Sequence, residues 1–295
     1  MTTREKLVAF LGTPLTVEPK AQRLEKQVFE TYTLETLQLT LNTVETVPAY
    51  FAYPNQKKAA PLVLFNHSHG GDFTRGKNEL LHSSAYLQPT SFLETLIDEG
   101  YAVGCIDMWG FGERQGKKES EWFKEFLVKG HTLWGMRLFD NQQFLTYLLQ
   151  RPEVDETRVG TIGLSMGGLM SWWLSAIDQR ITCCVDLAGQ VDLVALIEQR
   201  GLDHHGFYYY LPGILTAFQT IDIQRLILPR PRLSIVGRED RMCPAKGVAF
   251  LDDQLKEAYA ANGVLPNWQS LQLTGGHQET KEMREAWKHF FRKWL

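Results

Sequence analysis

Gly163-Leu164-Ser165-Met166-Gly167 is the most informative segment of this chain. It has the pattern G-x-S-x-G, and it stands between an apolar run, residues 158–162, and a run typical of a helix, residues 168–174. A serine on so sharp a turn has a strained backbone, and the flanking glycines leave room for it. The turn exposes the serine hydroxyl, and the N–H of Met166 at the helix start faces any negative charge that develops there. The stretch therefore predicts a nucleophilic serine between a strand and a helix.

Two residues that could activate this serine follow it in the chain. Asp240 lies just after the apolar run 233–236, and His277 lies just after the run 268–273. Loops at the carboxyl ends of parallel strands meet at one edge of a sheet, so both side chains can reach Ser165. A histidine can take the serine proton at neutral pH, and a carboxylate fixes the tautomer of the histidine. We expect Ser165, Asp240 and His277 to be the catalytic residues.

The acid has competitors in the sequence. Asp240 sits in a short turn between Gly237 and Pro244, which favours it, although an aspartate there could equally cap a helix. Glu239 is one residue away, so its side chain should point elsewhere. Asp186, which follows another apolar run, is the fallback.

The loop after the apolar run 61–65 reads Asn66-His67-Ser68-His69-Gly70-Gly71. An oxyanion hole needs a second backbone N–H besides that of Met166, and this loop should supply it. We expect the N–H of His69 to do so, with Ser68 and Gly70 as alternatives. The pair His67 and His69 is also a weak zinc pattern, together with His204-His205. No Cys or carboxylate stands at ligand spacing, so no metal site is expected.

Short apolar runs alternate with helical stretches along most of the chain, which predicts β-α-β units and a mostly parallel sheet covered on both faces. Two alternating segments before them, residues 33–41 and 44–53, predict an antiparallel N-terminal edge. We expect a single α/β domain over residues 1–295 with a doubly wound, eight-stranded sheet. The remaining predicted strands are residues 61–65, 101–106, 159–163, 181–185, 233–236 and 268–273, and the predicted helices are residues 91–99, 133–150, 167–177, 244–261 and 279–295.

Three other parts of the chain are irregular. Residues 1–30 have an amphipathic pattern and predict a helical extension broken by prolines. Residues 110–132 and 189–230 are longer than a crossover needs and are rich in aromatic residues, so we expect the second of them to form a cap over the site. On this basis Trp109, Trp122 and Tyr209 are the candidate walls of a substrate pocket.

Composition excludes several classes of function. The net charge of −3, from 31 basic and 34 acidic residues, and the lack of a basic run argue against nucleic acid or an anionic membrane as a partner. The first apolar patch is too short for a signal peptide, so we expect a cytoplasmic protein. Its four cysteines, none in a C-x-x-C pair, fit a reduced compartment: Cys105, Cys183, Cys184 and Cys243.

Two motifs resemble sites for other chemistry. Residues 71–78 almost fit a phosphate-binding loop, but Asn78 replaces the hydroxyl that would bind Mg²⁺, so nucleotide binding is not expected. Asp107 and Arg114 follow an apolar run, and we interpret them as an ion pair that holds a structural turn.

With these residues in view, the chain resembles the α/β-hydrolase superfamily over nearly its whole length. The stretches 66–77, 101–114, 163–167 and 205–213 are similar to its dienelactone-hydrolase-like and acetyl-xylan-esterase-like (cephalosporin-deacetylase-like) branch. The resemblance implies a metal-independent, cofactor-free carboxylesterase that acts on small acyl groups. Its partner would be a small-molecule ester. Whether the chain forms a homo-oligomer stays open, and a prolyl-oligopeptidase-like peptidase or amidase and a non-catalytic binding module remain the alternatives.

Overall fold

The computed structural model describes residues 1–56 and 58–295. Within them, nine strands form one sheet in the order β1-β2-β3-β5-β4-β6-β7-β8-β9. The pairs from β5 to β9 are parallel, and the pairs among β1, β2, β3 and β5 are antiparallel. The mostly parallel sheet with an antiparallel N-terminal edge is therefore confirmed, although the expected number of eight strands was one too few. The strands are β1 (Thr16–Val28), β2 (Tyr32–Asn42), β3 (Val47–Pro54), β4 (Ala60–Asn66), β5 (Ala102–Ile106), β6 (Val154–Gly163), β7 (Cys183–Leu187), β8 (Arg232–Gly237) and β9 (Trp268–Leu273).

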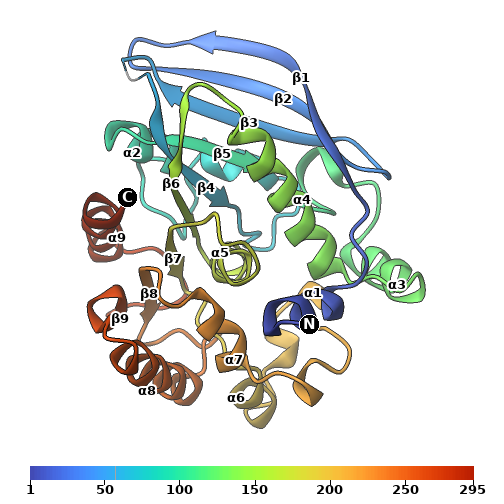
Figure 1. The fold of residues 1–295 in the computed structure, drawn as a ribbon, viewed down its shortest axis with the longest axis vertical. Coiled ribbons are helices and arrows are strands. Elements are labelled where there is room, and N and C mark those ends of the chain that lie inside the picture. The colour runs from blue at the N-terminus through green and yellow to red at the C-terminus, as the bar shows by residue number, and fades with distance from the viewer. Residues whose placement is uncertain (57) are drawn as a thin grey trace.

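Helices cover both faces of this sheet (Figure 1). α2 and α9 bury their apolar sides on one face, and α1, α4 and α5 bury theirs on the other. Each predicted helix is present, and side-chain caps mark the start of several: Ser91 accepts a hydrogen bond from the Glu94 N–H, and Thr132 accepts one from the Gly135 N–H. The helices are α1 (Thr3–Leu11), α2 (Phe92–Asp98), α3 (Glu119–Val128), α4 (Leu133–Leu148), α5 (Met166–Ile177), α6 (Leu193–Glu198), α7 (Thr220–Gln224), α8 (Ala245–Ala261) and α9 (Lys281–Trp294).

The additional strand corrects the prediction of an N-terminal helical extension over residues 1–30. Only α1 is helical there, and β1 pairs antiparallel with β2 along the edge of the sheet. Almost every residue of β1 is exposed, so neither face shows the apolar alternation from which a strand is predicted. Pro19 is tolerated because the strand lies at an edge, and a register shift between Arg23 and Glu25 leaves Leu24 as an extra, exposed residue.

The segment between β7 and β8 is a series of short helices. Besides α6 and α7 it contains the 3-10 helices η3 (Leu202–His204), η4 (Phe207–Tyr209), η5 (Ile214–Thr216) and η6 (Arg225–Ile227). Three side chains of this segment, those of His204, His205 and Tyr208, line the cavity that contains Ser165. The segment therefore forms one wall of the site that the sheet edge carries.

Two observations concern the environment of the chain. All four cysteines are buried and free. Within the described residues, no helix combines the length and the apolar character that crossing a bilayer requires.

Candidate active site

Ser165 lies on the turn between β6 and α5 with a backbone conformation of φ 58° and ψ −119°. This region is unfavourable for a residue with a side chain, and it persists because the surroundings hold it. The Ser165 N–H donates to the Leu187 carbonyl at 2.8 Å. A Cβ atom at Gly163 or Gly167 would collide with the Asn66 carbonyl oxygen, so the two flanking glycines let β4 approach the turn. The strand–turn–helix unit expected from the sequence is present.

A chain of hydrogen bonds runs from Ser165 through His277 to Asp240. The distance from His277 Nε2 to Ser165 Oγ is 2.7 Å, and that from His277 Nδ1 to Asp240 Oδ2 is 2.8 Å. Because a carboxylate can only accept, Nδ1 carries a proton, and Nε2 is left to accept the serine hydroxyl proton. The Asp240 side chain is fully buried and that of His277 is 28% exposed. The three residues follow the carboxyl ends of β6, β8 and β9. The sequence predicted that all three lie at this edge of the sheet.

The competing acids are engaged elsewhere. Glu239 Oε2 accepts a hydrogen bond from the Gly275 N–H at 2.6 Å and so holds the loop before His277. Asp186 is buried in an ion pair with Arg232, at 2.9 Å from its Nε. The other oxygen of Asp240 accepts from the Met242 N–H at 2.9 Å, which helps to hold the carboxylate beside His277.

Two backbone N–H groups in the loop after β4 remain candidates for the oxyanion hole. The Ser68 N–H already donates to Glu79 Oε1 at 2.8 Å, and the Gly71 N–H donates to His69 Nδ1 at 3.0 Å. Within the described part of the chain, the N–H groups of His69 and Gly70 have no hydrogen-bond acceptor. On the opposite side, Met166 is the first residue of α5, where an N–H has no partner inside the helix. His69 and Met166 therefore stay the predicted pair, Gly70 remains an alternative, and Ser68 is excluded.

Glu79, in the 3-10 helix η1 (Gly76–Leu80), organises this loop, a role that no sequence pattern predicted. Its carboxylate is 1% exposed and accepts three hydrogen bonds: the Ser68 N–H, the Ser68 hydroxyl at 2.7 Å and the Tyr86 hydroxyl at 2.8 Å. Burial raises the pKa of Glu79. Tyr86 in turn lies against Gly70, where a Cβ atom would collide with its ring. The Glu79 carboxylate thus holds Ser68, which precedes His69, and Tyr86, which packs on Gly70, and so positions the peptide groups of His69 and Gly70.

Glu79→Gln should therefore lower kcat of the reaction at Ser165 by about 10²-fold and change KM much less, because a misplaced oxyanion donor weakens binding of the transition state only. An amide has a single acceptor oxygen for three donors, so the loop must shift. Tyr86→Phe removes one donor and keeps the other two, and it should cost less than Glu79→Gln. Steady-state kinetics and thermal unfolding of both variants check this. A Glu79→Gln variant that unfolds at a lower temperature but retains the wild-type kcat would restrict Glu79 to stability.

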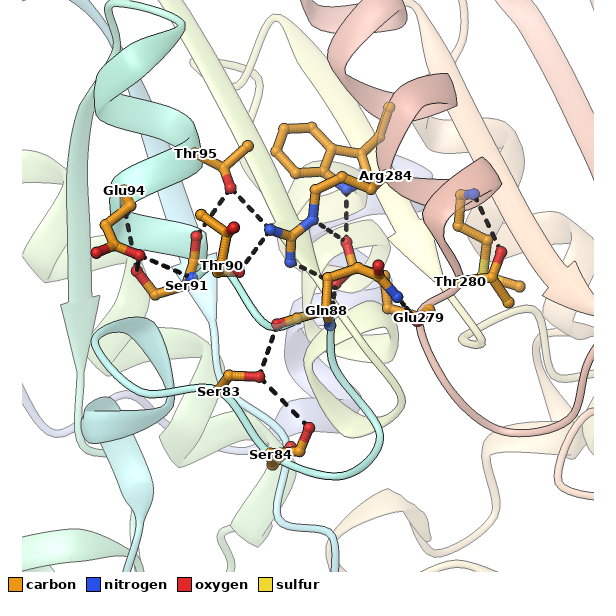
Figure 2. A network of polar contacts seen from close by, with 12 residues as sticks. Ser83, Ser84, Gln88, Thr90, Ser91, Glu94, Thr95, Glu279, Thr280 and Arg284 are labelled. Atoms are coloured by element: carbon orange, nitrogen blue, oxygen red, sulfur yellow. Dashed lines mark hydrogen bonds and ion pairs between the residues drawn. The ribbon is translucent and has the colours of Figure 1, made fainter.

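The loop that follows His277 is held by a buried ion pair (Figure 2). The Arg284 guanidinium binds both carboxylate oxygens of Glu279, at 2.8 and 2.5 Å, and also donates to the Thr90 carbonyl and the Thr95 hydroxyl. Gln88 Nε2 donates to the Glu279 carbonyl at 2.8 Å, and the Glu279 N–H donates to the Tyr86 carbonyl at 2.8 Å. The segment that carries Tyr86 is thereby tied to the histidine loop as well as to Glu79, so both sides of the site share one scaffold.

Ser165 and His277 open into a cavity of about 210 Å³. The expected wall residues are not there: Trp109, Trp122 and Tyr209 are 1%, 6% and 1% exposed. Trp109 packs edge-on against Trp122 at 4.9 Å between ring centres, inside the core. Trp109, Trp122 and Tyr209 serve core packing rather than the site, which corrects the prediction. The other residues that line the cavity are Ser68, His69, Gly70, Gly71, Tyr86, Leu164, His204, His205, Tyr208 and Met242.

Burial shifts the pKa of two histidines that line this cavity, His69 and His205. Burial lowers the pKa of His205 to about 4, and its Nε2 lies 2.9 Å from the Met242 carbonyl. Burial also lowers the pKa of His69, and it lowers that of His67 to about 3. His67 Nε2 accepts from the Met108 N–H, which uses the nitrogen that a metal would need. The described residues contain no group of three or more His, Cys, Asp or Glu side chains arranged to hold a metal ion.

The two motifs that resembled other sites have structural roles. Lys77, the lysine of the near phosphate loop, is 1% exposed and pairs with Asp107 at 3.0 Å and with Glu113. The predicted pairing of the Asp107 and Arg114 side chains is wrong. Arg114 donates to the backbone carbonyl of Asp107 at 2.8 Å and forms its ion pairs with Asp140 and Glu45.

Comparison with known proteins identifies a matching family, a similar protein sequence and solved structures of the same fold. A family model described as X-Pro dipeptidyl-peptidase (S15 family) matches residues 46–227. A protein of Bacillus subtilis (strain 168) named "Putative hydrolase YtaP" is 45% identical over 298 residues, which cover 99% of this chain and 98% of that protein.

Solved structures of esterases share the fold at low sequence identity. The glucuronoyl esterase from Solibacter usitatus matches with a TM-score of 0.70 and 16% identity, over 99% of this chain and 92% of its own. Acetyl xylan esterase 1 from Thermoanaerobacterium sp. JW/SL YS485 matches with a TM-score of 0.60 and 17% identity, over 99% and 98%. Methylesterase BT1017 matches with a TM-score of 0.70 and 19% identity over 98% of this chain, which spans 60% of that longer protein.

The family match covers more than half of the chain, and the relative from Bacillus subtilis is similar from end to end. The mostly parallel sheet with its antiparallel edge is part of the fold that the chain shares with the solved esterases. The chain therefore belongs to the X-Pro dipeptidyl-peptidase (S15) family and is of the α/β-hydrolase type.

Proposed function

We propose that the protein is a serine esterase that hydrolyses small, uncharged acyl esters through an acyl-enzyme. The observation that carries this proposal is the hydrogen-bonded chain Ser165–His277–Asp240, whose serine end opens into the 210 Å³ cavity. That volume is below the usual range for drug-sized ligands, about 300–1,000 Å³, so a short acyl group suits it. Burial lowers the pKa of both His69 and His205, two of the residues that line the cavity, which favours an uncharged substrate.

The reaction follows from the positions of these groups. Ser165 Oγ attacks the ester carbonyl carbon while His277 Nε2 takes its proton, and Asp240 stabilises the charged imidazole. The carbonyl oxygen becomes negatively charged and is bound by the backbone N–H groups of Met166 and His69. His277 then returns the proton to the departing alcohol. Water, activated by the same histidine, hydrolyses the acyl-enzyme and releases the acid.

The family match makes removal of an X-Pro dipeptide the second candidate. That reaction requires recognition of a charged N-terminal ammonium group, and a buried ammonium needs a carboxylate partner. Among the described residues that line the cavity there is neither an Asp nor a Glu, and Asp240 is buried behind His277. The lining therefore favours a neutral ester over a peptide with a free amino group.

A substrate panel tests the choice. We expect turnover of ethyl acetate and p-nitrophenyl acetate, and hydrolysis of Gly-Pro p-nitroanilide at a kcat/KM at least about 10²-fold lower, since an unpaired ammonium would be buried. A fluorophosphonate probe should label Ser165, as the peptide mass after digestion reports. Faster cleavage of the dipeptide anilide than of either ester would replace the esterase proposal with the peptidase.

A further inference from the structure

A second cavity of about 470 Å³ lies beside the one that contains Ser165. Two phenylalanines, Phe73 and Phe207, line it with rings that are 36% and 52% exposed. The polar part of its lining includes Gln115, Lys117 and Glu119. The two exposed phenylalanines line the same cavity, so they give it apolar surface that a bound ligand would cover.

The two cavities share one wall. The His69 ring, which faces the first cavity, stacks on the Phe73 ring of the second at 5.3 Å between centres and 17° between planes. On the other side Tyr208 lines the first cavity, and its chain neighbour Phe207 lines the second. The two cavities are therefore adjacent at His69, and a substrate long enough to extend from Ser165 past this ring would reach Phe73.

The charges around the second cavity are largely neutralised within the protein. Glu119 pairs with the buried Arg137 at 3.2 Å, and Lys117 pairs with Glu125 while its ammonium lies over the Trp122 ring. The lysine at the start of α3, Lys118, is exposed, so solvent screens its charge. Phe73 stacks on His69 and Phe111, and Phe207 lies against Phe123, yet both phenylalanines stay exposed at the cavity. This exposed apolar surface favours an apolar ring as the occupant.

We propose that this second cavity binds the alcohol part of the ester, and that the preferred alcohol bears a flat, apolar ring. The inference rests on the proposed esterase function for the direction of the substrate, with the small acyl group in the cavity of Ser165 and the leaving alcohol on Phe73 and Phe207. Stacking of an aromatic ring on phenylalanine is favourable beyond the burial of its area. The ring of the alcohol would lie between the loop that carries Phe73 and the 3-10 helix η4, which carries Phe207.

The affinity of a free alcohol for the second cavity tests the proposed subsite without any hydrolysis, because an alcohol is not a substrate. The probe is 2-naphthylmethanol, measured by calorimetry on wild type and on Phe207→Ala. We expect Phe207→Ala to raise Kd about 3- to 10-fold. The matched control is Phe29→Ala, since Phe29 is also an exposed phenylalanine, 42% accessible, with a single ring neighbour, Tyr32. It lies at the β1–β2 turn and should leave Kd unchanged.

Kinetics gives the second measurement. The ratio of kcat/KM for 2-naphthylmethyl acetate to that for ethyl acetate should fall about 3- to 10-fold in Phe207→Ala and stay constant in Phe29→Ala. Equal Kd values for Phe207→Ala and wild type, or no binding of the naphthyl alcohol to wild type, would overturn the proposed subsite. If ethyl acetate is hydrolysed in that case, the esterase proposal stands. If no ester is hydrolysed but Phe207→Ala still weakens the alcohol, the second cavity is a ring-binding site and the esterase proposal fails.

Discussion

Replacing Ser165 with alanine should lower kcat for p-nitrophenyl acetate by about five to six orders of magnitude and leave the fold intact. Loss of the nucleophile in a serine–histidine–aspartate enzyme has about this effect. The residual rate comes from the oxyanion donors and the binding of substrate, which the substitution leaves in place. Alanine retains the Cβ atom, so the turn at φ 58° keeps its conformation and its hydrogen bond to Leu187.

Ser165→Gly is the matched control for this experiment. It removes the same hydroxyl and also relieves the positive φ, because glycine adopts that region freely. Both variants should be inactive, and Ser165→Gly should unfold at the higher temperature of the two. A Ser165→Ala protein that keeps more than about a tenth of the wild-type kcat would exclude Ser165 as the nucleophile.

Asp240→Asn should lower kcat by about 10⁴-fold, the second largest effect expected. The carboxylate accepts two hydrogen bonds, one from His277 Nδ1 and one from the Met242 N–H. An amide accepts at its oxygen alone. If the oxygen keeps the Met242 N–H, the NH₂ group faces His277 and forces the ring proton onto Nε2, where the nitrogen can no longer accept the Ser165 proton.

Glu239→Gln controls for the loss of a negative charge in the same loop. The Glu239 carboxylate accepts from the Gly275 N–H, a bond that the amide oxygen of glutamine can keep. We expect less than about a tenfold change in kcat. Steady-state measurements of kcat for both variants over pH 6–9 provide the comparison. A larger loss in Glu239→Gln than in Asp240→Asn would assign the acid to Glu239.

The sequence predicted the residues whose order and spacing are prescribed by the chemistry. Ser165 and His277 could be found because a sharp turn needs its glycines and because loops after parallel strands converge on one edge. The buried strands could be found because they are short, continuous apolar runs, and the long helices because helical stretches separate those runs. Asp240 needed one further step, the choice against its neighbour Glu239, which rested on the direction of adjacent side chains.

Other features left no signal of that kind. β1 has water on both faces, so its residues carry no alternation. Trp109 and Tyr209 are aromatic, as residues in pocket walls often are. The residue type alone does not say whether a ring faces the core or a cavity, and both of these rings face the core. Glu79 is a single acid in a run with Leu80 and Leu81, and its role depends on Ser68 and Tyr86, which only the folded chain brings to it.

The strand β1 has a consequence for how the protein behaves when concentrated. Its 13 residues form an open sheet edge, which in principle is a template on which further chains could add strand by strand. Lys20, Arg23 and Lys26 place repeated positive charge along that edge, Pro19 removes a donor, and the displaced Leu24 interrupts its regular pairing. These are the means by which natural sheets prevent runaway polymerisation, so the edge can remain uncovered without becoming a seed for fibrils.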